Sequence, residues 1–117
     1  MTTAYVKYLE AAGARAVPLA WSLSEEKMRE RMNELNGILF PGGDMDLVID
    51  GEYSDFTKGA LRAWNIAKEM NDKNDYFPLW GTCQGHELFA VLLAESHDIL
   101  GPSESVDKFA TLEYEME

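Results

Sequence analysis

The only cysteine of this chain stands in a setting that suits a nucleophile. The segment 77–87, FPLWGTCQGHE, passes from apolar residues through a glycine-flanked turn directly into an apolar helical pattern. A sharp turn from strand to helix holds its central side chain in the open, at the carboxyl edge of a sheet. Because such a turn is strained, its neighbours must be small, as Gly81 and Gly85 are. This spacing predicts that Cys83 is a nucleophile, whereas a cysteine without such flanks is usually a buried structural residue.

The helix expected after Cys83 would favour the reactive form of its sulfur. The free N–H groups and the positive dipole end of that helix would face the sulfur and stabilise a thiolate. The backbone N–H of Gln84 would also face the oxygen of a tetrahedral intermediate, where a donor stabilises the developing charge. The segment therefore predicts acyl-transfer chemistry at Cys83.

A second glycine-rich loop, Pro41–Asp44, follows the short apolar run Ile38–Phe40. Two adjacent glycines allow the backbone to approach a ligand closely. In a parallel sheet this loop and the cysteine turn would both lie beyond the carboxyl ends of strands, where ligands bind. One N–H from the loop and that of Gln84 would then form an oxyanion hole with two donors. An ordinary glycine-rich turn is the alternative, and only the pairing with the cysteine turn favours the oxyanion hole.

Helical and strand-like patterns alternate along the chain, which predicts an α/β fold with a parallel sheet. The patterns predict helices over 3–12, from Ser22 or Ser24 to about 35, over 56–70 and over 84–94, and strands over 14–21, 38–40, 76–80 and near 98–100. Gly13 is expected to end the first helix. The buried helix positions are expected to be Met28, Met32, Leu35, Leu61, Trp64, Ile66, Ala67, Leu88, Val91 and Leu92. The acidic tail 103–117 receives no assignment.

The composition argues against some classes of binding partner but identifies none. A length of 117 residues, 46% of them apolar, fits a single domain with a core. The formal net charge of −11 argues against nucleic acid and anionic membrane surfaces as partners. One cysteine forms no internal disulfide, and we recognise neither a signal peptide nor a transmembrane segment in the sequence.

Four segments of the chain resemble the gamma-glutamyl hydrolases, a family of cysteine peptidases among the class I glutamine amidotransferase-like hydrolases. They are residues 5–10 (YVKYLE), 12–15 (AGAR), 36–43 (NGILFPGG) and 75–85 (DYFPLWGTCQG). The resemblance runs from about residue 4 to residue 100. The G-x-C-x-G core is common to the superfamily, whereas the Trp-Gly-Thr-Cys context and the segment 36–43 are more specific to the hydrolases.

The resemblance implies a fold, an activity and a set of site residues. The fold would be a flavodoxin-like three-layer α/β sandwich with a mainly parallel sheet, and residues 1–117 would form one partial domain of it. The activity would be hydrolysis of folate poly-gamma-glutamates through a cysteine thioester, with no cofactor and no metal. Cys83 would be the nucleophile, and Gly43 and Gln84 the oxyanion donors, with Gly42 as the alternative loop donor. Glu87 would support the site or contact substrate, although a carboxylate also stabilises the first turn of any helix.

The chain also departs from the family pattern. The family has an opening strand before the first helix, and its catalytic histidine, with an acidic residue close behind, lies well downstream of the cysteine. Neither feature is found in this sequence, so we expect a truncated form with weak or no turnover. His86 replaces a residue that is usually apolar, and we expect it on the helix surface. We expect His97 at the opposite end of the sheet, so neither histidine is expected to serve as the base.

Two other functions stay open: a glutaminase subunit of an amidotransferase, and a non-catalytic remnant or pseudoenzyme. The ligand would be a folyl poly-gamma-glutamate or a gamma-glutamyl peptide, and a homodimer is an assembly that stays open. The resemblance implies a vacuolar, lysosomal or extracellular protein, while the lack of a recognisable signal peptide leaves the cytoplasm open.

Overall fold

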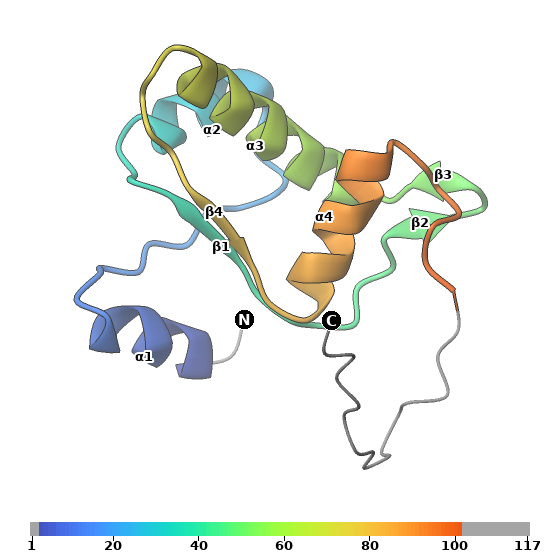
Figure 1. The fold of residues 1–117 in the computed structure, drawn as a ribbon, viewed down its shortest axis with the longest axis horizontal. Coiled ribbons are helices and arrows are strands. Elements are labelled where there is room, and N and C mark those ends of the chain that lie inside the picture. Colours follow the sequence, from blue (N-terminus) through green and yellow to red (C-terminus); the bar gives the residue numbers. More distant parts are fainter. Residues whose placement is uncertain (1–2, 102–117) are drawn as a thin grey trace, which may run out of the picture.

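A computed structural model describes residues 3–101, and Figure 1 shows the arrangement of its elements. In chain order these are α1 (Thr3–Ala11), α2 (Glu25–Met32), β1 (Ile38–Phe40), β2 (Val48–Ile49), β3 (Glu52–Tyr53), α3 (Asp55–Asp72), β4 (Leu79–Gly81) and α4 (Gln84–Ala94). The predicted helices and the strands β1 and β4 are therefore confirmed, with shifted ends for most of them. The tail 103–117 lies outside the described residues.

The strands β1 and β4 form a parallel pair, as the alternation of elements predicts. Leu39 pairs with Trp80 and Phe40 pairs with Gly81, so the carboxyl ends of both strands are level. The N–H of Thr82 continues the ladder by donating to the carbonyl oxygen of Phe40 at 3.0 Å. The loops that follow β1 and β4 consequently begin side by side.

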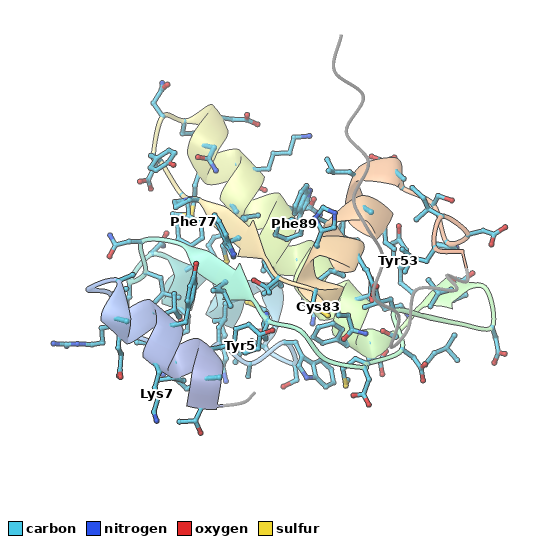
Figure 2. The ribbon with its side chains drawn as sticks, turned by 60° about the horizontal axis from the view of Figure 1, so that its bottom comes forward. Tyr5, Lys7, Tyr53, Phe77, Cys83 and Phe89 are labelled. Atoms are coloured by element: carbon cyan, nitrogen blue, oxygen red, sulfur yellow. The ribbon has the colours of Figure 1, made fainter. Side chains whose placement is uncertain are left out.

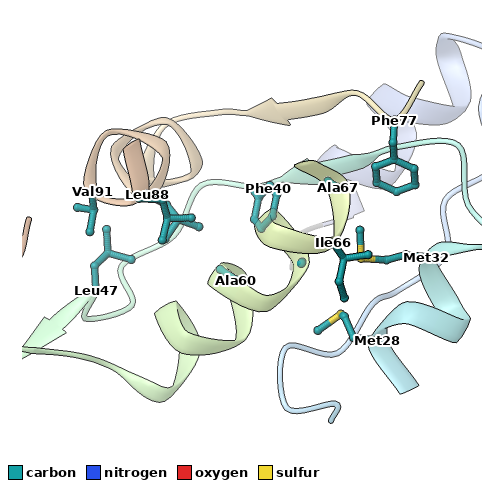
Figure 3. Packing of buried hydrophobic residues seen from close by; sticks show 12 residues of the cluster. Met28, Met32, Phe40, Leu47, Ala60, Ile66, Ala67, Phe77, Leu88 and Val91 are labelled. Atoms are coloured by element: carbon teal, nitrogen blue, oxygen red, sulfur yellow. The ribbon is translucent and has the colours of Figure 1, made fainter. Parts of the chain in front are cut away.

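The helices cover the two sides of this strand pair unequally. Helices α3 and α4 lie on one side of β1 and β4, and α1 lies on the other side (Figures 1 and 2). The buried apolar residues come from α2, α3, α4, β1 and the segments just before β2 and β4, and Figure 3 shows how they pack. They are Met28, Met32, Phe40, Leu47, Ala60, Ala63, Ile66, Ala67, Phe77, Leu88, Val91 and Leu92. Leu35, Leu61 and Trp64, also predicted as core positions, are partly buried against this cluster.

The start of α2 decides between the two capping serines. Ser24 has extended backbone angles, and its side chain accepts a hydrogen bond from the N–H of Lys27 at 3.4 Å. Because α2 begins at Glu25, Ser22 is too far upstream to cap it, and the alternative cap is wrong. The helix ends at Met32 rather than near residue 35.

Two predicted strands are absent from the described part of the chain. Residues 14–21 and 98–100 are irregular, because no neighbouring strand among residues 3–101 offers them a ladder. Pro18 also lacks the N–H that a ladder needs. Without a partner several of their apolar residues stay accessible, such as Val17 and Ile99, which are 50% and 45% exposed, whereas Leu19 packs against the core.

One hairpin is present that we did not predict. Strands β2 and β3 pair antiparallel through the turn residues Asp50 and Gly51, whose φ angles are 51° and 78°. Positive φ at both turn positions is the type I′ geometry that Asp-Gly favours. The dipeptide was the available signal for this hairpin.

Candidate active site

The turn between β4 and α4 has the geometry that the glycine spacing predicts. Cys83 stands between Gly81, the last residue of β4, and Gln84, the first of α4. Its φ and ψ are 55° and −118°, a conformation that costs about 1–3 kcal/mol outside glycine. The residue is exposed, so the turn presents the thiol to solvent.

The two flanking glycines are required by close packing. A Cβ on Gly85 would lie 2.2 Å from the carbonyl oxygen of Phe40, and one on Gly81 would lie 2.6 Å from the carbonyl oxygen of Gly85. Neither glycine has a positive φ. Lack of space, rather than backbone freedom, is therefore what excludes a side chain at both positions.

The first turn of α4 leaves one N–H in the position expected for an oxyanion donor. The N–H of Gly85 donates to Thr82, and those of His86 and Glu87 donate to the carbonyl oxygen of Cys83 at 2.8 and 3.2 Å. Within residues 3–101, no acceptor takes the N–H of Gln84. This donor adjoins the thiol and is free to bind an anionic oxygen.

The loop after β1 lies directly against the cysteine. A Cβ on Gly42 would lie 3.0 Å from Cβ of Cys83 and 3.5 Å from its Sγ. A Cβ on Gly43 would lie 3.2 Å from Oε1 of Gln84. The structure thus brings together the two glycine-rich segments that the sequence analysis paired.

Two side chains hold this loop: that of Tyr5, which was not predicted as a site residue, and that of Gln84, which was predicted only for its backbone N–H. The hydroxyl of Tyr5 accepts the N–H of Gly42 at 2.8 Å, and Figure 2 shows Tyr5 reaching from α1 toward the turn that carries Cys83. The side-chain amide of Gln84 accepts the N–H of Met45 at 3.0 Å and donates to the Met45 carbonyl at 2.6 Å. In both contacts the two residues are far apart in the sequence, and no local sequence pattern predicts such contacts.

The remaining candidate residues, Glu87, His86 and His97, lie on α4 or just after it. Glu87 is exposed on the first turn of α4 and lines a shallow hollow of about 270 Å³ that extends from Gln84 to His97. His86 is exposed on the same helix, as predicted. His97 follows the far end of α4, where its ring meets that of Tyr53 with 4.3 Å between centroids. Among the described residues neither imidazole ring is hydrogen-bonded to the Cys83 thiol, and His86 contacts Cys83 only through the backbone bond given above.

Comparison with known proteins gives a consistent result. Residues 1–96 match the Peptidase C26 family. The chain is 42% identical over 100 residues to gamma-glutamyl hydrolase B of Dictyostelium discoideum, which covers 86% of this chain and 28% of the relative. It is 41% identical over 107 residues to gamma-glutamyl hydrolase of Homo sapiens, covering 92% of this chain and 32% of the relative. It is 30% identical over 114 residues to gamma-glutamyl hydrolase 1 of Arabidopsis thaliana, covering 97% of this chain and 31% of the relative. The chain spans less than a third of the length of each.

Proposed function

The chain belongs to the peptidase C26 family, and we propose that it carries the nucleophile half of a site that hydrolyses gamma-glutamyl bonds. The family has the class I glutamine amidotransferase-like fold, of which β1, β4 and their helices are an incomplete α/β part. Folyl poly-gamma-glutamates or gamma-glutamyl peptides are the proposed substrates. The observation that carries the proposal is the position of the Gly42–Gly43 loop against Cys83.

In the proposed reaction, the Cys83 sulfur attacks the carbonyl carbon of the gamma-amide and the carbonyl oxygen becomes an oxyanion. The N–H groups of Gly43 and Gln84 bind this oxyanion, because the N–H of Gly42 already donates to Tyr5. Collapse of the intermediate breaks the carbon–nitrogen bond, and the amine leaves with the proton that the Cys83 thiol gave up to a general base. Water then attacks the thioester, releasing the gamma-glutamyl acid and regenerating the thiol.

The proton transfers limit what this chain achieves by itself. A general base must come within about 2.6–3.2 Å of the proton it takes. The imidazole rings of His86 and His97, the two histidines of the sequence, make no hydrogen bond with the Cys83 thiol in residues 3–101. We therefore expect weak turnover from this chain alone, and formation of the thioester is the more sensitive assay.

The test is to offer the chain an activated gamma-glutamyl ester, whose leaving group needs no protonation, and to measure its intact mass. We expect one gamma-glutamyl group per chain, located at Cys83 and removed by hydroxylamine. The Cys83→Ala variant provides the baseline, because a methyl group cannot form a thioester. Absence of the adduct in the native chain would favour the non-catalytic remnant.

A second assay separates the hydrolase from the glutaminase alternative. Folyl-gamma-diglutamate and free glutamine are incubated with the chain, and glutamate and ammonia are quantified separately. Residual release of glutamate from the diglutamate, lost in Cys83→Ala, would support the hydrolase. Release of ammonia from glutamine in excess of that reaction would favour the glutaminase.

The cellular location and the assembly stay predictions. Vacuolar, lysosomal or extracellular placement rests on the family resemblance, and a homodimer is untested. No helix within residues 3–101 is sufficiently long and apolar to cross a membrane.

A further inference from the structure

We propose that the side chain of Gln84 is a positioning residue, which holds the loop 41–45 over Cys83 together with the hydroxyl of Tyr5. The catalytic meaning of this inference rests on the proposed function, because the loop carries the proposed oxyanion donor. The geometry itself does not depend on that function.

The contact between Gln84 and Met45 is a pair of complementary hydrogen bonds. The amide oxygen of Gln84 accepts the Met45 N–H at 3.0 Å, and the amide nitrogen donates to the Met45 carbonyl at 2.6 Å. A primary amide presents an acceptor and a donor side by side, so it pairs with one residue of extended backbone as a neighbouring strand would. Few side chains offer both groups at this spacing, and a leucine or glutamate at position 84 would lose one bond or both.

Tyr5 provides a second attachment at the other end of the loop. Its hydroxyl accepts the N–H of Gly42 at 2.8 Å, and a Cβ on Gly42 would lie 2.6 Å from that hydroxyl oxygen. The loop is thus fixed at Gly42 from α1 and at Met45 from α4. Gly43 lies between the two attachments, and its N–H has no acceptor among residues 3–101.

This arrangement couples the two proposed donors through one residue. The backbone N–H of Gln84 is one donor, and the side chain of the same residue restrains the loop that carries the other. A loop with two adjacent glycines otherwise samples many conformations. Oxyanion donors are effective only when they are held in place before charge develops. Gln84 therefore acts on the site through the loop as well as through its own backbone.

The direct test is site-resolved amide hydrogen exchange by NMR in the full 117-residue chain. Gln84→Met keeps the chain length and helix propensity of the side chain but removes both hydrogen bonds. We expect the Met45 amide to exchange about threefold to tenfold faster, as loss of one exposed hydrogen bond implies, with Gly42 unchanged. Tyr5→Phe should give the reverse result, faster exchange at Gly42 and unchanged exchange at Met45. His86→Ala, on the same helix turn but pointing to solvent, should change neither amide.

A second variant and an inhibitor-binding assay test the same inference independently. If Gln84→Met fails to fold by circular dichroism, Gln84→Ala tests the same contact, because its methyl group offers Met45 neither an acceptor nor a donor. Binding of a gamma-glutamyl aldehyde should weaken by at least about tenfold in either variant, while the rate of alkylation by iodoacetamide stays within about twofold. The aldehyde forms a tetrahedral adduct that needs the oxyanion hole, whereas alkylation needs only the thiol.

The outcomes separate this inference from the proposed function. Unchanged exchange at Met45 in both Gln84 variants would overturn the restraint itself. Faster exchange with unchanged aldehyde affinity would overturn the positioning role. A native chain that does not bind the aldehyde would contradict the proposed function, and the exchange data would still decide whether Gln84 holds the loop.

Discussion

The turn that carries Cys83 and the N-terminal segment are held in opposite ways. Helix α4 buries Leu88, Val91 and Leu92, and its second residue, Gly85, packs directly on the backbone of β1. Helix α1 buries no residue, and the segment that follows it, residues 14–21, is irregular. The cysteine turn is therefore fixed by core packing, whereas α1 is attached through partly exposed contacts such as that of Tyr5 with Gly42.

This difference shows which parts of the proposed site are held by core packing and which are not. The cysteine and the Gln84 donor belong to the packed half of the molecule. The loop donor is restrained partly from α1, the less packed half. We expect substitutions around α4 to lower the free energy of unfolding strongly. We expect substitutions in α1 to change the geometry of the loop with little effect on the free energy of unfolding.

The largest expected effect is in the core beneath α4. Leu88 is 1% exposed, so Leu88→Ala should lower the free energy of unfolding by about 2–5 kcal/mol through lost burial and a cavity. Tyr8 on α1 is 57% exposed, and Tyr8→Ala should change the free energy of unfolding by less than about 0.5 kcal/mol. Urea unfolding followed by tryptophan fluorescence measures both. Equal effects would mean that α1 is as firmly packed as α4.

The close approach of α4 to β1 gives the next effect. Gly85→Ala would place a methyl group 2.2 Å from the Phe40 carbonyl oxygen. Because that oxygen belongs to the backbone, α4 or β1 would have to shift to relieve this clash. We expect a loss near the upper end of about 1–3 kcal/mol in unfolding free energy. Gly101→Ala is the matched control, because nothing lies within 4 Å of its Cβ position. A neutral Gly85→Ala would show that the turn is looser than described.

Strain at the nucleophile predicts a gain in stability. Because Cys83 has φ 55°, Cys83→Gly should raise the unfolding free energy by about 1 kcal/mol after the greater chain entropy of glycine is deducted. Cys83→Ala should give no such gain, since alanine has the same backbone restriction. Thermal unfolding of the two variants side by side measures the difference. A glycine variant no more stable than the alanine variant would contradict the strain.

Gly13, just after α1, also has a positive φ, but it lies outside the packed core. Gly13 has φ 86° and nothing within 4 Å of its Cβ position. Gly13→Ala should therefore cost about 1 kcal/mol or somewhat more, from the left-handed conformation alone. If α1 frays independently of the core, the loss will appear in local amide exchange of α1 and not in global unfolding.

The smallest expected effect concerns an exposed ion pair between α2 and α3. Arg29 contacts Glu69 at 2.8 Å and Glu25 at 3.4 Å. The hydrogen bond from Arg29 is the main cause that lowers the pKa of Glu69, and its charge adds to this. The stabilising contribution is therefore present above the unfolded-state pKa of Glu69 and is lost as pH falls through the lower, folded-state pKa.

Replacement of the carboxylate tests this sign. Glu69→Gln should be slightly less stable than the native chain near neutral pH, and the difference should vanish in acid. Denaturant midpoints measured across the acid range provide the comparison. A difference that grows as pH falls would mean that Glu69 is not stabilised in its charged form.

The sequence predicted the packed half well. Helix α4 was predicted with its observed ends, and the parallel pair of β1 and β4 followed from short apolar runs between helices. Both depend on local patterns and on the G-x-C-x-G spacing. The Asp50-Gly51 hairpin was not predicted, although the Asp-Gly dipeptide is a local signal for it.

The other features that the sequence did not predict depend on interactions between distant segments. The run 14–21 has strand-like residues, but a strand exists only where a neighbour completes its ladder. The restraints on the loop join Tyr5 to Gly42 and Gln84 to Met45, pairs that approach only once the fold is formed. Tyr5 opens the segment 5–10 that resembles the family, and nothing in its sequence surroundings distinguished a hydroxyl that accepts a backbone N–H.

The most direct measurement is the rate at which a gamma-glutamyl diazomethyl ketone alkylates Cys83, relative to iodoacetamide, in the native chain and in urea. The chain has one cysteine, so intact mass reports on that residue alone. We predict that the native fold raises the relative rate by about 100-fold, because the ketone reacts through an oxyanion that Gly43 and Gln84 would stabilise. The same relative rate in native and unfolded chain would contradict a preformed half-site for gamma-glutamyl transfer.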